Sequence, residues 1–186
     1  MSDADDRALV DAVAGHGDER AFGILYDRHT PAMHGLALRL AGGCESDAED
    51  VVHDAWIRAA ERLPTFEWRS TLRSWLCGFV VLRWREVLRR SRREPVIVAR
   101  DDALSTTDYV LDFAAERVDL ERAVRGLANG YREVLVLHDI EGFTHEEIGS
   151  MLGIETGTSK SQLSRARRAV RQALLEPGEE QRNGRP

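Results

Sequence analysis

Residues 144–168 read THEEIGSMLGIETGTSKSQLSRARR and decide how the second half of the chain folds. Thr144 and Glu147 have the Thr-x-x-Glu spacing of a capping box, in which a hydroxyl and a carboxylate satisfy unpaired backbone N–H groups. A helix is therefore predicted to start here. Gly153 suits the left-handed end of a helix, and a second helix is predicted from about Gly157. The stretch thus predicts a helix-turn-helix.

The second of these helices has one apolar side and one polar side. Its apolar residues recur three or four positions apart, at Leu163, Ala166, Val170 and Ala173. Cations and amide donors reach phosphates and base edges in a major groove. The predicted DNA contacts therefore lie off the apolar side, at Lys160, Ser161, Gln162, Ser164, Arg165 and Arg168. An Arg-rich helix is also often only a solvated surface, and this alternative stays open here.

Charge is distributed along the chain in blocks. The 186 residues have a net charge of −6, so the overall charge by itself gives no sign of a nucleic-acid partner. Residues 1–63 hold thirteen acids against six bases, whereas residues 64–93 hold eight arginines and only two glutamates. Such a chain can offer basic strips to a polyanion while the rest of its surface repels non-specific contacts.

Several function classes have no support in the sequence. It contains no Gly-rich phosphate loop and no His-Glu-x-x-His motif, and its six histidines lack metal-ligand spacing, so we expect no enzyme, metal or cofactor. Cys44 and Cys77 are expected to be plain thiols. The N-terminus lacks the pattern of a signal peptide, and no apolar run is long enough to insert into a membrane. We therefore expect a cytoplasmic protein.

Apolar residues recur at helical spacing through most of the chain, without strand-period runs. The predicted fold class is all-α, with two small helical domains joined by a flexible linker. The predicted domains are residues 7–93 and 117–175, with a linker over 94–116 and a disordered tail over 176–186. Pro31 is expected to bend or restart its helix.

Four segments, in order, resemble the extracytoplasmic-function sigma factors, compact members of the sigma-70 superfamily that keep only the second and fourth conserved regions. The segments are GDERAFGILYDRHTPAMHGLALRL, SDAEDVVHDAWIRAAERLPTF, LRSWLCGFVVLRWREVLRRSRR and YREVLVLHDIEGFTHEEIGSMLGIETGTSKSQLSRARRAVRQAL. The resemblance implies an alternative sigma factor that binds core RNA polymerase and directs promoter-specific initiation. It makes residues 7–93 region 2, and residues 117–175 region 4, which recognises the minus-thirty-five element.

The acidic segment DAEDVVHDAWIRA, residues 47–59, resembles the family's element that docks on the clamp helices of RNA polymerase. Asp47, Asp50, Asp54 and Arg58 share one helical face with Glu61, away from the apolar stripe. Charged faces are usually only solvated, so the family context carries this assignment. The resemblance places polymerase binding on Asp47, Asp50, His53, Asp54 and Arg58.

The segment PTFEWRSTLRSW, residues 64–75, interleaves aromatic residues with arginines, a combination that suits unstacked bases and a phosphate backbone. In the family, this loop and the next helix recognise the minus-ten element and capture a flipped base as the duplex opens. The resemblance assigns minus-ten binding to Phe66, Trp68, Arg69, Arg73 and Arg83. Trp75 lies in an apolar helical run, so a core position is expected for it.

The chain departs from the family's usual pattern at three single positions and in one turn. Leu82 stands where many members have Asn, which leaves the minus-ten sequence preference open. Glu86 replaces a frequent Asp, Ser159 replaces a frequent Val, and residues 128–130 replace a commoner Pro-containing turn. We expect these three to be variants of the same scaffold.

Two other classes remain as alternatives. An ordinary helix-turn-helix transcriptional regulator binds an operator, usually as a dimer, and needs neither the acidic helix nor the aromatic and basic loop. A helical adaptor without a DNA role would show no steep loss of nucleic-acid affinity with salt. For a sigma factor, the resemblance implies core RNA polymerase, promoter DNA and an anti-sigma factor as partners.

Overall fold

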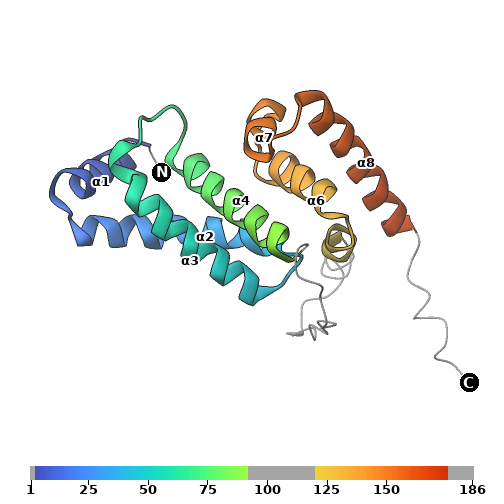
Figure 1. The fold of residues 1–186 in the computed structure, drawn as a ribbon, viewed down its shortest axis with the longest axis horizontal. Coiled ribbons are helices and arrows are strands. Elements are labelled where there is room, and N and C mark those ends of the chain that lie inside the picture. Colours follow the sequence, from blue (N-terminus) through green and yellow to red (C-terminus); the bar gives the residue numbers. More distant parts are fainter. Residues whose placement is uncertain (1–2, 92–119, 176–186) are drawn as a thin grey trace, which may run out of the picture. The chain divides into compact units, whose positions relative to one another are not determined.

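The computed structural model of the protein describes residues 3–91 and 120–175, and every regular element within these ranges is a helix. The chain forms two compact units, Met1–Asp102 and Ala103–Pro186, each of which is described below by itself (Figure 1). The predicted all-α fold class is confirmed.

The first unit consists of a short 3-10 turn and four helices, namely α1 (Asp3–His16), α2 (Glu19–Leu40), α3 (Glu45–Arg62), η1 (Leu63–Thr65) and α4 (Leu72–Ser91). α2, α3 and α4 each pack against the other two, while α1 packs against α2 and η1. The helices meet through aliphatic side chains, because burying each one contributes about 1.5–3 kcal/mol. The largest of these are Leu25, Met33, Leu36, Leu40, Val51, Leu72, Leu76, Val80 and Val81.

α2 remains one helix across Pro31, so the predicted restart does not occur. A proline has no backbone N–H, so Pro31 cannot donate the usual helical hydrogen bond to the carbonyl of Asp27. Because this part of α2 is exposed, water can bind that carbonyl instead. Leu25 and Met33, on either side of the proline, are both 1% exposed and belong to the same core. Packing of this stripe therefore outweighs the local preference.

A buried carboxylate fixes α1 to α2. Asp6 accepts a hydrogen bond from Arg28 at 2.5 Å and lies 3.0 Å from Nε2 of His29. Burial lowers the pKa of His29, and the attraction of Asp6 only partly opposes this effect. A neutral imidazole therefore donates to Asp6 at neutral pH, and the contact holds α1 against the bundle.

In the second unit, the described chain begins with a helix over residues 120–125. The later elements are α6 (Asn129–Leu135), the π-helical turn η2 (Val136–Ile140), α7 (His145–Leu152) and α8 (Thr156–Leu175). α8 packs against both α6 and α7. The predicted linker, residues 94–116, and the predicted tail, residues 176–186, lie outside the described residues.

α7 and α8 form the predicted helix-turn-helix. Thr144 accepts a hydrogen bond from the backbone N–H of Glu147, whose carboxylate accepts one from the N–H of Thr144, so the capping box is confirmed. Gly153 ends α7 in the left-handed region, at φ 62°. A Cβ at Gly149 would lie 2.8 Å from the carbonyl oxygen of Ile154, so a turn this tight requires glycine.

Candidate nucleic-acid interface

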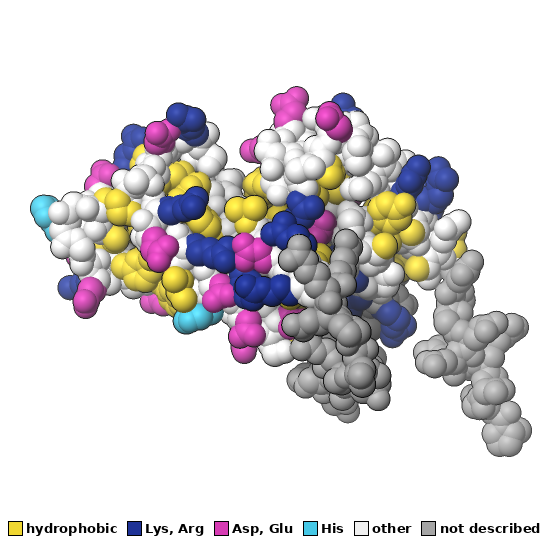
Figure 2. Space-filling model, in the orientation of Figure 1, with side chains coloured by type: hydrophobic (Ala, Val, Ile, Leu, Met, Phe, Trp, Pro, Cys, Tyr) yellow, Lys and Arg dark blue, Asp and Glu magenta, His cyan; other side chains and the backbone are white. Residues whose placement is uncertain are grey.

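α8 turns an apolar side to the second unit and a polar side to solvent. Leu163, Ala166 and Val170 are buried as expected, whereas Ala173, in the last turn, is exposed. Most of the predicted minus-thirty-five contacts are exposed, and Gln162 is half-buried. The exposed ones are Lys160, Ser161, Ser164, Arg165 and Arg168. Figure 2 shows Lys and Arg side chains over α8.

A shallow hollow of about 350 Å³ lies along this helix. It is lined by His145, Lys160, Leu163, Ser164, Arg167, Arg168 and Arg171. Four cationic side chains around one hollow create a positive potential that suits a phosphate group. The predicted contacts did not include His145, Arg167 and Arg171. Arg167 lies three residues after Ser164, and Arg171 lies four residues after Arg167, so helical spacing places both arginines on the side of α8 that carries Ser164.

Arg167 is held by a carboxylate from η2. Its Nε and its second amino group donate to Asp139 at 2.9 and 2.6 Å, and Nδ1 of His138 lies 2.7 Å from the same carboxylate. The hydrogen bond from Arg167 is the largest cause that lowers the pKa of Asp139. Two bonds in the plane of the guanidinium fix its orientation, so this arginine fastens α8 to η2.

His145 connects the two helices of the motif. Its Nδ1 lies 2.9 Å from Oγ of Ser159, which is 0% exposed, and its ring stacks on His138 at a centroid distance of 4.5 Å. Burial lowers the pKa of His145, and the positive charges of His138, Lys160 and Arg167 act in the same direction. The contact with Ser159 sets the start of α8 against the start of α7.

In the first unit, a column of aromatic rings runs from the loop between η1 and α4 onto α4, where it ends on the buried Phe79. Phe66 lies 4.7 Å from Trp68 and 4.8 Å from Trp75, and Trp75 lies 4.7 Å from Phe79, all between ring centroids. Trp75 is half-buried rather than part of the fully buried core that was expected. Trp68 has φ 57°, a left-handed conformation that costs a residue with a bulky side chain about 1–3 kcal/mol.

The three arginines predicted to bind minus-ten DNA differ in their surroundings. Arg69 is exposed and pairs with Glu67 at 2.6 Å, and Arg73 is exposed on the first turn of α4. Arg83 has a side chain only 11% exposed and pairs with Asp54 of α3 at 2.5 Å. In this structure, Arg83 therefore joins α3 to α4 and is not directed to solvent.

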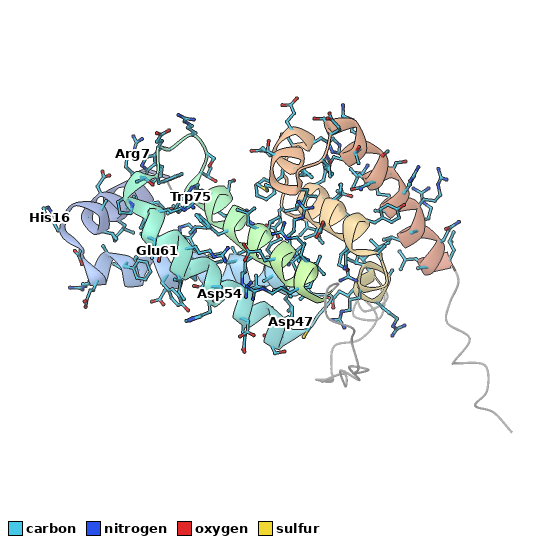
Figure 3. All side chains as sticks on the ribbon, in the orientation of Figure 1. Arg7, His16, Asp47, Asp54, Glu61 and Trp75 are labelled. Atoms are coloured by element: carbon cyan, nitrogen blue, oxygen red, sulfur yellow. The ribbon has the colours of Figure 1, made fainter. Side chains whose placement is uncertain are left out.

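The predicted polymerase-binding residues all lie on α3 and also fall into two groups. Asp50 and His53 are exposed, and Asp47 is half-buried. Asp54 and Arg58 take part in a network across the α3–α4 boundary, where Arg58 donates to both oxygens of Glu86 at 2.8 Å. Figure 3 shows Asp47, Asp54 and Glu61 along one side of α3, and Figure 2 shows acidic and basic side chains interspersed over α3 and α4.

The part of the chain that the structure describes contains neither a metal-binding cluster nor a membrane-spanning helix. Within residues 3–91 and 120–175, no three His, Cys, Asp or Glu side chains are grouped to hold a metal ion. Across the same ranges, no helix is long and apolar enough to cross a membrane.

Comparison with known proteins matches both units to one superfamily. Residues 25–94 match the family described as Sigma-70 region 2, and residues 117–170 match Sigma-70, region 4. The chain is 30% identical to the ECF RNA polymerase sigma factor SigM of Mycobacterium tuberculosis, over 91% of this chain and 86% of that protein. It is 28% identical to the RNA polymerase sigma-H factor of Pseudomonas aeruginosa, over 94% and 96%.

Two solved structures share the fold. The sigma factor RpoE of Bartonella quintana, in complex with the anti-sigma factor NepR, aligns with a TM-score of 0.67 and 26% identity, over 83% of this chain and 96% of its own. CnrH, in complex with the cytosolic domain of CnrY, aligns with a TM-score of 0.63 and 27% identity, over 94% and 99%. The chain therefore belongs to the extracytoplasmic-function RNA polymerase sigma factors, alternative sigma factors that direct promoter-specific initiation of transcription.

Proposed function

We propose that the protein joins core RNA polymerase, reads the minus-thirty-five element of a promoter as duplex, and receives the minus-ten element as an unpaired strand. The observation that carries this proposal is the group of half-buried rings of Phe66, Trp68 and Trp75, next to the exposed Arg69 and Arg73. Stacking surfaces beside cations suit a single strand. A regulator that binds only duplex operator DNA has no use for such a group.

The duplex-reading surface is the exposed side of α8. Arg165 and Arg168 follow Lys160 and Ser164 along this side, so a helix placed in a major groove would turn cations and hydroxyls to bases and phosphates. Arg167 lines the same hollow as Lys160, Ser164 and Arg168, and Asp139 fixes its orientation. This arrangement supports minus-thirty-five contacts by Lys160, Ser161, Gln162, Ser164, Arg165 and Arg168.

The polymerase-docking surface is the exposed part of α3. The direct contacts are assigned to Asp50 and His53, whose side chains are exposed, together with the half-buried Asp47. Asp54 and Arg58 mainly hold α3 against α4, and part of each side chain remains exposed. Complementary charges at such an interface steer association and fix its register.

The remaining proposals concern regulation and compartment. Two structural neighbours are sigma factors in complex with an anti-sigma factor or with the cytosolic domain of CnrY, and this supports an anti-sigma partner here. A partner that covers α8 or the aromatic column would block DNA binding. The protein works in the cytoplasm, where its polymerase is, and it supplies recognition and strand opening without catalysing a reaction.

Run-off transcription tests the proposal. Purified protein is added to core RNA polymerase with a library of genomic fragments, and core alone serves as the control. We expect discrete transcripts that depend on the protein and start at fixed distances from a shared sequence. If the protein binds duplex fragments but yields no protein-dependent transcript, the chain acts as an ordinary DNA-binding regulator and the proposal is wrong.

A further inference from the structure

The aromatic column continues onto a helix that precedes the residues matched by region 2. The guanidinium carbon of Arg7, on α1, lies 5.0 Å from the ring centroid of Trp68. Figure 3 shows Arg7 and Trp75 on either side of the loop that joins η1 to α4. A cation over an indole face is held by the quadrupole of the ring. The column therefore ends on α1 with a positive charge.

The position of Arg7 is set by its neighbour in the sequence. Asp6 is 7% exposed and is paired with Arg28 and His29 of α2, whereas Arg7 is exposed. Adjacent residues of a helix point about 100° apart, so Asp6 can point inward while Arg7 lies over Trp68 of the loop. α1 also packs directly on η1, which leads into that loop.

Trp68 is held on two sides. Phe66 contacts its ring at 4.7 Å, and Arg7 covers it at 5.0 Å. Its backbone stays in the left-handed region, at φ 57°, although a bulky residue avoids that conformation. Such a conformation persists only where the surroundings enforce it, and it is common at ligand-binding sites.

The contact with Trp68 uses none of the hydrogen-bond donors of Arg7 on a carboxylate. A guanidinium is planar and carries five N–H donors in that plane. Among the side chains that the structure describes, no carboxylate pairs with Arg7, whereas the neighbouring Arg69 pairs with Glu67. An oriented edge of this kind matches the oxygens of a phosphate.

We propose that α1 forms one wall of the single-strand site, and that Arg7, backed by Trp68, binds a phosphate of the unpaired promoter strand. The inference rests on the proposed function, in which the loop at residues 66–71 receives that strand. It adds a phosphate contact from an element outside the residues that match region 2, which are 25–94.

The test uses holoenzyme reconstituted from the full chain and core RNA polymerase. Affinity for short fluorescein-labelled single strands of random sequence is measured by anisotropy at several salt concentrations, and core alone gives the baseline. Arg7→Ala should bind about tenfold more weakly, because a charge-assisted hydrogen bond is lost. The slope of log affinity against log salt should become shallower by about 0.7, the value for one single-strand phosphate.

Two variants serve as matched comparisons. Arg20→Ala removes the same charge from an exposed position of α2 and should behave as wild type. Arg7→Lys keeps the charge, and therefore the salt slope, but its affinity should fall between those of wild type and Arg7→Ala because the planar donor edge is lost. Tryptophan fluorescence during urea unfolding verifies that each variant is folded.

The outcomes separate this inference from the proposed function. Wild-type affinity in Arg7→Ala overturns the inference, and so does weaker affinity with an unchanged salt slope, which would mean that Arg7 only positions Trp68. The double variant Phe66→Ala, Trp68→Ala is measured in parallel. If it alone weakens binding, the single-strand site stands without Arg7. If neither variant weakens binding, the site itself is wrong.

Discussion

At the scale of single residues, Glu86 and Ser159 each have a polar partner on a neighbouring helix. Glu86 accepts two hydrogen bonds from Arg58, and this contact is the largest cause that lowers its pKa. The side chain of Ser159 is buried against His145, where its hydroxyl has a hydrogen-bond partner that a valine would leave unsatisfied. Both side chains are therefore satisfied where they stand, as expected for variants of the same scaffold.

Asp50→Lys should weaken binding to core RNA polymerase by about 2 kcal/mol, if this exposed carboxylate meets a cation at the interface. Titration of labelled core polymerase measures the affinity. Asp11→Lys, the same charge reversal on an exposed position of α1, is the control. Equal affinities for wild type and Asp50→Lys would remove this residue from the docking surface.

Asp54 is a poorer position for the same test, because it pairs with Arg83. Asp54→Lys should lower the free energy of unfolding of the first unit by about 1–3 kcal/mol, since the largely buried guanidinium of Arg83 loses its closest partner and keeps only Glu86 at 3.3 Å. Urea unfolding followed by tryptophan fluorescence measures this change. A variant as stable as wild type would show that the ion pair contributes nothing.

Arg165→Ala should lower affinity for a duplex minus-thirty-five fragment by about 1–3 kcal/mol and relax its sequence preference, if Arg165 contacts a base. If it contacts a phosphate, affinity falls evenly across sequences and the salt slope shrinks by about one. The fragment comes from promoters selected by run-off transcription. Arg125→Ala, an equal charge loss in the helix over residues 120–125, is the control, and wild-type binding by Arg165→Ala would exclude this contact.

At the scale of elements, the loop after η1 is shaped by the helices around it. Thr71 begins α4 by accepting a hydrogen bond from the N–H of Ser74 at 3.1 Å, and Phe66 closes η1 with a bond to the carbonyl of Leu63 at 3.1 Å. Only four residues, 67–70, lie between these two ends, so Trp68 has little room and takes a left-handed backbone. The loop that carries Phe66 and Trp68 is therefore held in position at both of its ends.

Phe66→Ala combined with Trp68→Ala should impair promoter opening while the closed complex still forms. The change removes stacking worth about 1–3 kcal/mol per base, comparable to the cost of extruding a base. Permanganate reactivity of unpaired thymines measures opening. A template with a mismatched minus-ten region should partly restore transcription, and normal opening on paired template would place the base pocket elsewhere.

At the scale of the molecule, the two units can be followed separately. All four tryptophans, at positions 56, 68, 75 and 84, lie in the first unit, so tryptophan fluorescence reports its unfolding alone. The same unit contains His29, which is surrounded by Asp6, Arg28 and Arg73 and whose pKa is lowered chiefly by burial. Its stability should therefore respond to pH in a defined direction.

Lowering the pH from 7.5 to 5.5 should destabilise the first unit. The folded pKa of His29 lies below the unfolded value of about 6.5, so the unfolded chain takes up its proton first as pH falls. Stability is then lost below pH 6.5, by at most about 1.4 kcal/mol per pH unit. His29→Gln, which can still donate to Asp6, should flatten this dependence, and an unchanged profile would contradict the assignment.

Local patterns were sufficient to predict the helices and the turn of the second unit. The capping box at Thr144, the left-handed Gly153 and the apolar steps from Leu163 to Val170 all involve residues within a few positions of one another. Such features depend on backbone hydrogen bonds and helical spacing, which the sequence displays directly. The all-α class and the exposed donors of α8 follow from the same local rules.

Contacts between distant residues were decided only by tertiary packing. The unbroken helix at Pro31, the pairing of Arg83 with Asp54, and Arg7 over Trp68 each depend on how separate helices meet. A helical pattern shows which side of a helix is apolar, but not which polar side chains from another helix will face its edge. The packing of the helices decides which partner a charged side chain meets, because a largely buried charge needs an opposite charge within reach.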